Sequence, residues 1–327
     1  MKRTLILILA LTLACTALFP VLAQAEPIRV AVVQPLTHTS LNQIRDTIIA
    51  ELENSGLGFE IVTRNAEGDS SSLSTILENV KNDGVDILVP IATNTAQRAK
   101  MVFEDTGIPV VFAAVSDPVA AGLTGDDCGF ITGVSNNIPA AEIVKLISDF
   151  QPEYKKIGFL YTSSETNSVS TINAAKAYCD GNGIAYEEVS ISNLSELQTA
   201  AETLISKGVD ALYTGNDNSI ASAMSTYIDV AYEYGVPVYC GADSMVADGG
   251  FATIGVDYVQ LGKQVAQIVI RLAQGEYPED IPYEILSDYA RFVNLQAADR
   301  VGMPISDEIL ASYRVLVEAD GTSHFGE

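Results

Sequence analysis

The sequence predicts an α/β protein with two similar lobes, each a parallel sheet covered by helices, joined by a hinge that the chain crosses several times. Apolar segments of strand length alternate with amphipathic segments from Ile28 onward, as in repeated βαβ units. The stretch 84–119 is echoed by 208–249: both contain Gly-Val-Asp, an apolar strand, three small polar residues, a helical segment and Gly-x-Pro-Val. Two copies this far apart indicate two lobes rather than a short-period solenoid.

The first lobe begins with the run 28–34, whose continuous apolar character is typical of a parallel strand buried on both faces. A helix over 40–54 follows, because apolar residues recur there at helical spacing, and Gly56 ends it. The other elements expected in this lobe are strand 59–63, helix 71–82, strand 86–91, helix 95–105, strand 109–114 and strand 131–135.

The same alternation starts again after residue 135 and predicts the second lobe. Its expected elements are helix 138–150, strand 157–162, helix 169–181, strand 184–189, helix 194–207 and strand 210–213. The last part of the chain predicts strand 253–256, helix 258–274, strands near 283–287 and 292–295, and helix 306–313. These elements are too few for a third core, so we expect the two lobes to share them. Residues 26–135 with 251–288 are assigned to lobe 1, and residues 136–250 with 289–327 to lobe 2.

Composition and charge limit the classes of partner. Hydrophobic residues make up 48% of the chain and charged residues 18%, which indicates a packed globular protein. The formal net charge is −24, and no cluster of basic residues offers a surface for phosphates. A nucleic-acid partner is therefore excluded, and we interpret the acidity as a contribution to solubility.

Residues 1–25 have the pattern of a secretory signal peptide: a basic start, an apolar stretch and a small-x-small ending. Cleavage after Ala25 is the first expectation, and it predicts export to the periplasm or another extracytoplasmic location. An uncleaved anchor and acylation at Cys15 are the alternatives. Acylation is less favoured, because Thr12 stands three residues before Cys15 and apolar sequence continues after it.

The remaining cysteines are Cys128, Cys179 and Cys240, an odd number that does not form a disulfide framework. One bridge between two of them is compatible with an oxidising compartment, but their spacing does not select the pair. A buried thiol that packs as a small hydrophobic side chain is the favoured interpretation for at least one.

Small polar residues gather where strands end and helices begin, which is where ligands bind in open parallel sheets. N-capping explains one such residue per helix, but several adjacent ones in both lobes exceed that need. Helix N–H groups near Thr93 and Ser116 suit a carboxylate, while Asp217 and Asp243 suit an amine. The candidate ligand-binding residues are Thr39, Ser40, Thr93, Asn94, Ser116, Asp117, Tyr161, Asn167, Asp217, Asn218 and Asp243.

The sequence contains no motif of a common enzyme class. Gly-x-Ser-x-Gly, a strand-ending Gly-x-Gly-x-x-Gly and a Walker loop are all missing from it. His38 and His324 are the only histidines, so a His-rich metal site or a Ser/His dyad is not expected. We interpret His38 as a cap or surface residue. The prediction is a protein with no catalytic residues, metal or cofactor.

Several segments, spread in order over nearly all of the chain after residue 25, resemble the tryptophan/aromatic-amino-acid-type substrate-binding proteins of ABC transporters. These segments are VPIATNTAQ (89–97), PVVFAAVSDPV (109–119), ITGVS (131–135), GFLY (158–161) followed by ExNS (165–168), DN (217–218) and GxDYxxLG (255–262).

The resemblance implies a type I periplasmic binding protein, with two Rossmann-like lobes, three hinge crossings and closure over a small ligand. A monomer that captures an amino acid-like ligand and delivers it to a permease is expected, and an aromatic amino acid is one candidate. The family's ligand contacts fall on Thr93, Asn94, Ser116 and Asp117 in one lobe and on Asn167, Asp217, Asn218 and Asp243 in the other. Many members carry a small residue or proline in the first loop, where this chain has Thr-His-Thr-Ser (37–40).

Three other functions are compatible with this fold. A periplasmic sensor that reports to a receptor kinase is not separable from an importer component by sequence. A sugar-repressor-type regulator needs a basic helix-turn-helix before the first strand, where the signal segment stands instead. A hydrolase on the same scaffold would turn over its bound ligand.

Overall fold

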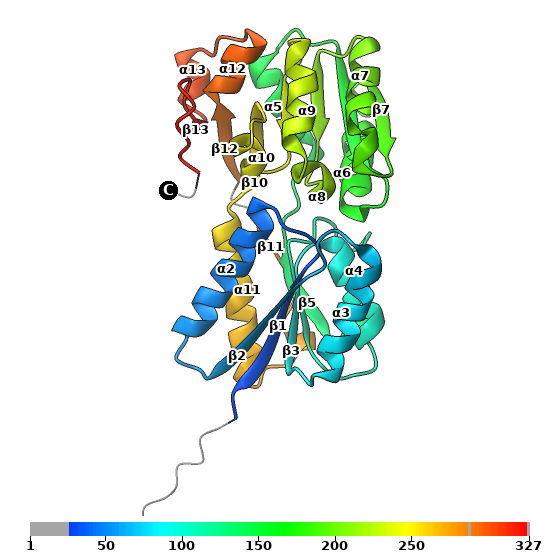
Figure 1. The fold of residues 1–327 in the computed structure, drawn as a ribbon, viewed down its shortest axis with the longest axis vertical. Helices are drawn as coiled ribbons and strands as arrows, with labels where there is room; N and C mark the ends of the chain where they lie inside the picture. Colours follow the sequence, from blue (N-terminus) through cyan, green and yellow to red (C-terminus); the bar gives the residue numbers. More distant parts are fainter. Residues whose placement is uncertain (1–25, 287–288, 326–327) are drawn as a thin grey trace, which may run out of the picture.

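A computed structural model describes residues 26–286 and 289–325, and Figure 1 shows them as two lobes stacked end to end. Each lobe contains one sheet with helices against it, so the predicted α/β class is confirmed. The predicted signal segment, including Cys15, lies outside the described residues. In the part of the chain that is described, no helix has both the length and the hydropathy needed to span a membrane.

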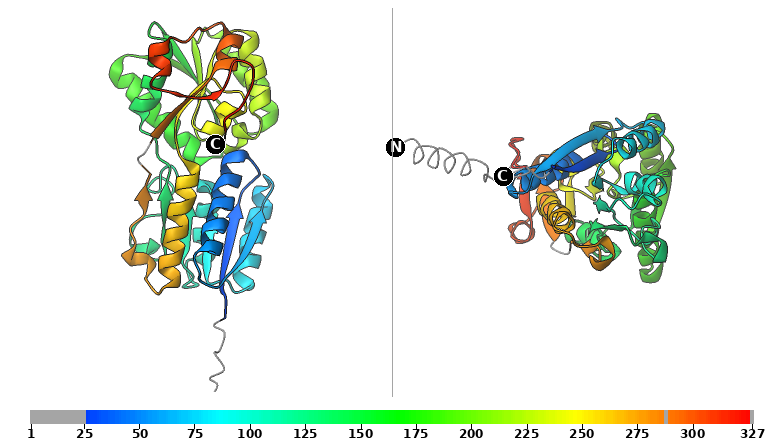
Figure 2. Two further views of the ribbon diagram at one scale, coloured as in Figure 1. Left: turned by 90° about the vertical axis from the view of Figure 1, so that its left-hand side faces the viewer. Right: turned by 90° about the horizontal axis from the view of Figure 1, so that it is seen from below.

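The sheet of lobe 1 has six strands, and all of its pairs are parallel. In spatial order they are β2 (Phe59–Asn65), β1 (Ile28–Gln34), β3 (Ile87–Pro90), β4 (Val110–Ala113), β5 (Ile131–Ser135) and β11 (Glu284–Ile285). Its helices are α2 (Thr39–Asn54), α3 (Ser70–Asn82), α4 (Thr93–Phe103) and α11 (Tyr258–Ala273). Helix α11 packs against α2, and α3 packs against α4 (Figure 2).

The sheet of lobe 2 has seven strands, with β12 antiparallel to β10 and every other pair parallel. Its spatial order is β7 (Ala185–Ile191), β6 (Lys156–Thr162), β8 (Ala211–Thr214), β9 (Val238–Cys240), β10 (Ala252–Val256), β12 (Tyr289–Asn294) and β13 (Arg314–Val317). The helices are α5 (Ala140–Phe150), α6 (Thr166–Asn182), α7 (Leu197–Ser206), α8 (Asn218–Ala221), α9 (Met224–Glu233), α10 (Asp243–Ala247), α12 (Leu295–Val301) and α13 (Asp307–Leu310).

The two sheets have the same topology, which explains the repeated sequence pattern. Lobe 1 runs in the order second, first, third, fourth, fifth strand, and lobe 2 repeats this order with β7, β6, β8, β9 and β10. The strand order reverses between β1 and β3 in one lobe and between β6 and β8 in the other. Ligands of open α/β sheets bind beside such reversal points, at the carboxyl ends of the strands.

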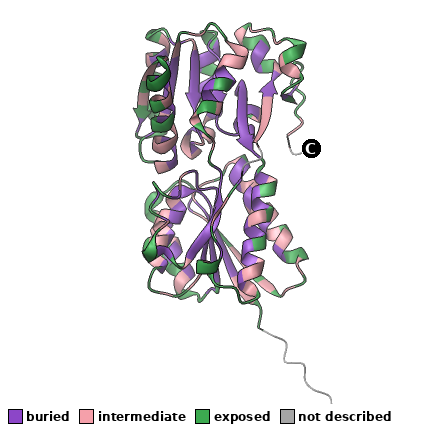
Figure 3. Cartoon of the chain, turned by 180° about the vertical axis from the view of Figure 1, so that it is seen from behind, coloured by how far each residue is buried: buried purple, intermediate pink, exposed green. Residues whose placement is uncertain are grey.

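Strand β1 is buried on both faces, as its continuous apolar sequence predicts. Val30 and Val32 contribute to one hydrophobic core, while Ala31 and Val33 contribute to another on the opposite face of the sheet. Figure 3 shows the same distribution for the whole chain, with buried strands inside and exposed residues on the outer sides of the helices.

The chain passes between the two sheets three times: after β5, after β10 and after β11. Strand β10 pairs with β9 and β12 and therefore belongs to the second sheet. The sequence-based assignment of residues 251–288 to lobe 1 is wrong for this strand. The chain leaves lobe 2 one element later, at the start of α11, and a short apolar strand does not show by its sequence which sheet it joins.

The C-terminal part contains two elements that the sequence analysis did not predict, α12 and β13. Asn294 caps α12 by accepting a hydrogen bond from the N–H of Ala297, and Gly302 ends the helix with φ +70°. Strand β13 has four residues and lies at the edge of the sheet, beside β12. Elements this short leave little periodic signal in a sequence.

The three cysteines within the described residues, Cys128, Cys179 and Cys240, are all free thiols and all buried. Burial raises the pKa of the Cys179 thiol to about 11. This is the behaviour expected of cysteines that pack as small hydrophobic side chains.

Gly133 in β5 provides a test of the packing of lobe 1. A Cβ atom at this position would lie 2.1 Å from the carbonyl oxygen of Phe112, far inside van der Waals contact. We expect Gly133→Ala to lower the free energy of unfolding by at least about 2 kcal/mol, measured by urea denaturation. Gly129→Ala is the matched control, because the nearest atom to its Cβ lies at 3.8 Å. Equal stability of the two variants would contradict this packing.

Candidate functional site

A cavity of about 20 Å³ lies between the lobes at the carboxyl ends of the strands. The polar residues that line it come from both lobes and from the crossings between them. They are His38, Ser40, Thr93, Ser116, Asn136, Asn167, Asn216, Asn218 and Tyr258. A volume of this size has room for about one water molecule, so a larger ligand enters only when the lobes separate.

The loops that carry these residues follow the strands on either side of the two reversal points. His38 follows β1 and Thr93 follows β3 in lobe 1, while Asn167 follows β6 and Asn216 follows β8 in lobe 2. The doubled topology therefore brings four equivalent loops together at one place. This arrangement is why residues far apart in the sequence share the cavity wall.

In lobe 1 the backbone before α4 leaves that helix without a side-chain cap. Ala92 occupies the N-cap position with φ +72° and ψ 157°, and an alanine side chain has no acceptor for the helix N–H groups. Ala114, shortly before Ser116, also has a positive φ of +57°. Left-handed backbone costs an alanine about 1–2 kcal/mol, and such strain concentrates at functional sites.

Four polar side-chain atoms of cavity-lining residues are buried and have no hydrogen-bond partner among the described residues. They are Nδ1 of His38, Oγ1 of Thr93, Oδ1 of Asn167 and Oδ1 of Asn216. Leaving a buried polar atom unpaired costs roughly 1–3 kcal/mol. Four of them around one cavity indicate a surface that is built to make hydrogen bonds to a ligand.

Hydrogen bonds connect the lobes around this cavity. Ser40 Oγ lies 2.5 Å from Ser244 Oγ, and Nε2 of His38 lies 3.1 Å from Oδ1 of Asn218. Further bonds join Asn94 to Ser164, Gln97 to Thr166 and Asp117 to Ser170. These contacts hold the two lobes in a closed arrangement.

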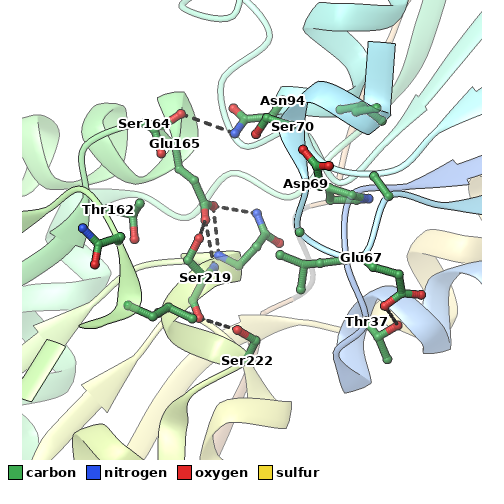
Figure 4. Close-up of a pocket in the computed structure, with 18 of the residues that line it drawn as sticks. Thr37, Glu67, Asp69, Ser70, Asn94, Thr162, Ser164, Glu165, Ser219 and Ser222 are labelled. Carbon is green, nitrogen blue, oxygen red and sulfur yellow. Dashed lines mark hydrogen bonds between the residues drawn. The ribbon is translucent and has the colours of Figure 1, made fainter. Parts of the chain in front are cut away.

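A second, open groove of about 530 Å³ is lined by residues of both lobes, shown in Figure 4. Its wall is mixed, with apolar side chains such as Leu36, Leu73 and Leu194 beside polar ones. Asn218 lines both the groove and the inner cavity. The two spaces therefore both border Asn218.

Asp217 lies at the start of α8 and does not line the cavity. Its carboxyl oxygens accept hydrogen bonds from the N–H of Thr162 at 2.6 Å, from the hydroxyl of Thr162 at 2.9 Å and from the N–H of Ile220 at 2.9 Å. Burial, and next the negative charge of Glu165, raise the pKa of Asp217 to about 7. The residue acts as a helix cap and as a tie between α8 and β6.

Asp243 and Tyr161 also lie outside the cavity wall. Asp243 is 9% exposed and accepts a hydrogen bond from the N–H of Ser244, and burial raises its pKa to about 6. The hydroxyl of Tyr161 lies 3.4 Å from Glu188 on the neighbouring strand β7. Tyr161 is thus paired within its own sheet and does not form an aromatic wall for this cavity.

The remaining candidates divide between the cavity and its surroundings. Ser40, Thr93, Ser116, Asn167 and Asn218 line the cavity. Asn94 lines the outer groove, Asp117 bonds across the lobes, and Thr39 is exposed.

Sequence reasoning missed four cavity residues: His38, Asn136, Asn216 and Tyr258. Two of them carried a signal, because His38 belongs to the polar loop after the first strand and Asn216 to the triplet that precedes α8. Asn136 and Tyr258 lie at hinge crossings; Tyr258 belongs to the segment GxDYxxLG (255–262) of the family resemblance, whereas Asn136 lies in none of the quoted segments. Burial lowers the pKa of His38 and raises that of Tyr258, so both rings are neutral at pH 7.

Within residues 26–286 and 289–325, no group of three or more His, Cys, Asp or Glu side chains is arranged to hold a metal ion. The polar groups at the cavity are amides, hydroxyls and one imidazole, which are suited to hydrogen bonding of a small polar molecule.

Comparisons with known proteins agree with this architecture. The tyrosine-binding protein of Clostridioides difficile (strain R20291) is 30% identical over 272 residues, which cover 81% of this chain and 78% of the relative. A solved ABC domain from Streptococcus pneumonia in complex with L-Trp is 32% identical, covers 88% of this chain and 99% of its own, and has a TM-score of 0.82.

A ligand-free, open structure of a substrate-binding protein with adhesive properties from Clostridium difficile is 29% identical. It covers 88% of this chain and 98% of its own, with a TM-score of 0.67. The fold expected from the sequence, that of a type I periplasmic binding protein, is confirmed. A family model described as ABC transporter substrate binding protein matches residues 29–316. The chain therefore belongs to the ABC transporter substrate-binding protein family.

Proposed function

We propose that this protein captures a zwitterionic α-amino acid between its lobes, outside the cytoplasm, and delivers it as a monomer to the permease of an ABC importer. The observation that carries the proposal is the unequal chemistry of the two sides of the cavity. Lobe 1 contributes the hydroxyl of Thr93 and the uncapped N-terminus of α4, both of which can donate to a carboxylate. Lobe 2 contributes unpaired amide oxygens of Asn167 and Asn216, which accept from an ammonium group.

The outer groove is where the side chain of the amino acid extends in this proposal. Its leucines provide apolar contact, and its polar residues offer hydrogen bonds at the rim. The names of two relatives, one tyrosine-binding and one solved with L-Trp, favour an aromatic side chain. The groove volume of about 530 Å³ is within the usual range for small-molecule sites.

Closure of the lobes over the ligand is part of the proposed mechanism. The chain has a higher TM-score with the L-Trp complex than with the ligand-free, open relative, 0.82 against 0.67, at similar identity. Interlobe bonds such as that between Ser40 and Ser244 form only when the two lobes meet. A ligand that contacts both lobes therefore shifts the population toward the closed state, which is the form presented to a permease.

The proposal predicts selective binding of unmodified amino acids. Calorimetry with L-tyrosine and L-tryptophan is expected to show binding, after a thermal-shift screen of the amino acids identifies the tightest. N-acetylation removes the ammonium and the carboxamide form removes the carboxylate, and each change is expected to weaken binding at least about tenfold. Affinities that are unchanged by both modifications would exclude the zwitterion as the recognised group.

Asp217 provides a test that separates structural support from ligand contact. We expect Asp217→Ala to lower the free energy of unfolding of the ligand-free protein by about 1–3 kcal/mol, because the N–H groups of Thr162 and Ile220 lose their acceptor. Urea denaturation measures this change. Asp229→Ala is the control, since Asp229 has a side chain 70% exposed and pairs with Arg300 at the surface. A stable Asp217→Ala protein that no longer binds ligand would instead make Asp217 a direct contact.

A further inference from the structure

Glu165 is a buried acid that does not line the inner cavity, yet its hydrogen bonds lead to it. The residue is 3% exposed and stands immediately before α6. Its oxygens accept four bonds from two residues at the start of α8: the N–H and the side-chain amide of Asn218 at 2.9 and 2.7 Å, and the N–H and hydroxyl of Ser219 at 2.8 and 2.7 Å. Figure 4 shows the side chain of Glu165 reaching toward Ser219.

The carboxylate of Glu165 fixes the orientation of the Asn218 amide. A carboxylate only accepts hydrogen bonds, so the NH2 group of Asn218 must face Glu165, and the amide oxygen Oδ1 must face the other way. That oxygen lies 3.1 Å from Nε2 of His38, across the cleft in lobe 1. Because Oδ1 is an acceptor, Nε2 of His38 must carry the hydrogen.

The tautomer of His38 follows from this chain of bonds. A neutral imidazole with hydrogen on Nε2 has an acceptor at Nδ1. Burial lowers the pKa of His38, which keeps the ring neutral near pH 7. Its Nδ1 is buried and has no partner in the described part of the chain, and the residue lines the cavity.

Asn167 is oriented by the same end of lobe 2. Its NH2 group donates to the carbonyl oxygen of Asn216 at 2.5 Å and lies 3.4 Å from Glu165. Both of these groups are acceptors, so the amide oxygen of Asn167 is the atom left for the cavity. That oxygen is buried and unpaired among the described residues, like Nδ1 of His38.

We propose that Glu165 is a positioning residue that sets the hydrogen-bond polarity of the cavity, and that His38 is a specificity-determining residue. Through Asn218, Glu165 holds His38 in the Nε2–H tautomer, so that Nδ1 accepts a hydrogen bond from the ammonium group of the ligand. This inference rests on the proposed function and names the chemistry that it selects: a ligand with an N–H donor at this position. In this arrangement His38 of lobe 1 contacts the same ammonium group that the amide oxygens of lobe 2 bind.

The tautomer is measured without any ligand. The sample is the chain from residue 26 onward, labelled with 15N, at pH 7.5. Long-range 1H–15N spectra are expected to show that Nδ1 of His38 carries no hydrogen and that Nε2 carries one. His38→Gln assigns the signals, since the sequence contains only two histidines. Asn218→Leu removes the acceptor while leaving the backbone bonds to Glu165, and it is expected to move the two 15N shifts of His38 toward each other. His324 serves as the internal reference. Hydrogen on Nδ1 in the unaltered protein would overturn the inference.

Two substitutions at position 38 separate the ligand contact from the interlobe bond. His38→Asn keeps a polar atom near the position of Nδ1, but its side chain is too short to bond to Asn218. His38→Gln is long enough to bond to Asn218 but has no acceptor at the position of Nδ1. Calorimetry measures the affinity for L-tyrosine and for its des-amino analogue, 3-(4-hydroxyphenyl)propionate, and the ratio of the two affinities is compared between variants. If another amino acid binds more tightly, that amino acid and its own des-amino analogue are used instead. We expect His38→Gln to reduce this ratio about tenfold or more and His38→Asn to reduce it less.

The outcomes distinguish the two proposals. An equal loss of affinity for both ligands in His38→Gln would show a purely structural role and overturn the inference, while amino acid binding itself would stand. If His38 has the Nε2–H tautomer but no amino acid binds, the proposed function is wrong. The ammonium group is then also excluded as the partner of His38.

Discussion

A buried carboxylate is stable in a protein only when protein donors replace the water that it has lost, and this constraint organises the ligand side of lobe 2. Glu165 satisfies it with backbone and side-chain donors of Asn218 and Ser219. Because those donors belong to the first residues of α8, the same bonds fix where that helix starts and which way the Asn218 amide faces. The loops of lobe 2 around the cavity are thus held by charge-assisted bonds, the strongest kind of hydrogen bond available to them.

The two lobes use one topology in two chemically different ways. The segments after β3 and β8 are equivalent in their sheets, but α4 begins after an alanine that cannot cap it, whereas α8 begins after Asp217, whose side chain caps it. An uncapped helix leaves N–H groups for an anion, and a helix capped by its own carboxylate does not. Lobe 2 consequently presents amide oxygens to the cavity instead. The segments after β3 and β8 therefore offer donors on one side of the cavity and acceptors on the other, which suits the zwitterion proposed as ligand.

The sequence predicted the α/β fold and polar residues at the strand ends, where the candidate cavity lies, because both depend on periodicity, which one sequence displays directly. It did not predict which polar residue at a strand end faces the cavity. Asp217 as a helix cap and Asp217 as a ligand contact have the same sequence signature, and only the positions of Thr162 and Ile220 separate them. His38 was interpreted as a cap or surface residue, because a single histidine beside a helix start is more often one of these; it lies at the N-cap position of α2 but makes no side-chain cap bond. Its role depends on Asn218, 180 residues away, and on the orientation of an amide.

Closure of the lobes depends on a small balance of free energies. A neutral hydrogen bond such as that between Ser40 and Ser244 contributes about 0.5–1.5 kcal/mol, and separation of the lobes returns both partners to water. Unpaired acceptors such as Oδ1 of Asn167 act against closure, because each unpaired buried polar atom costs roughly 1–3 kcal/mol. For the proposed amino acid ligand, charge-assisted bonds from its ammonium and carboxylate to opposite sides of the cavity would shift that balance toward closure. In the proposed mechanism, the unpaired polar atoms that destabilise the ligand-free closed form are therefore the same atoms that make closure depend on the ligand.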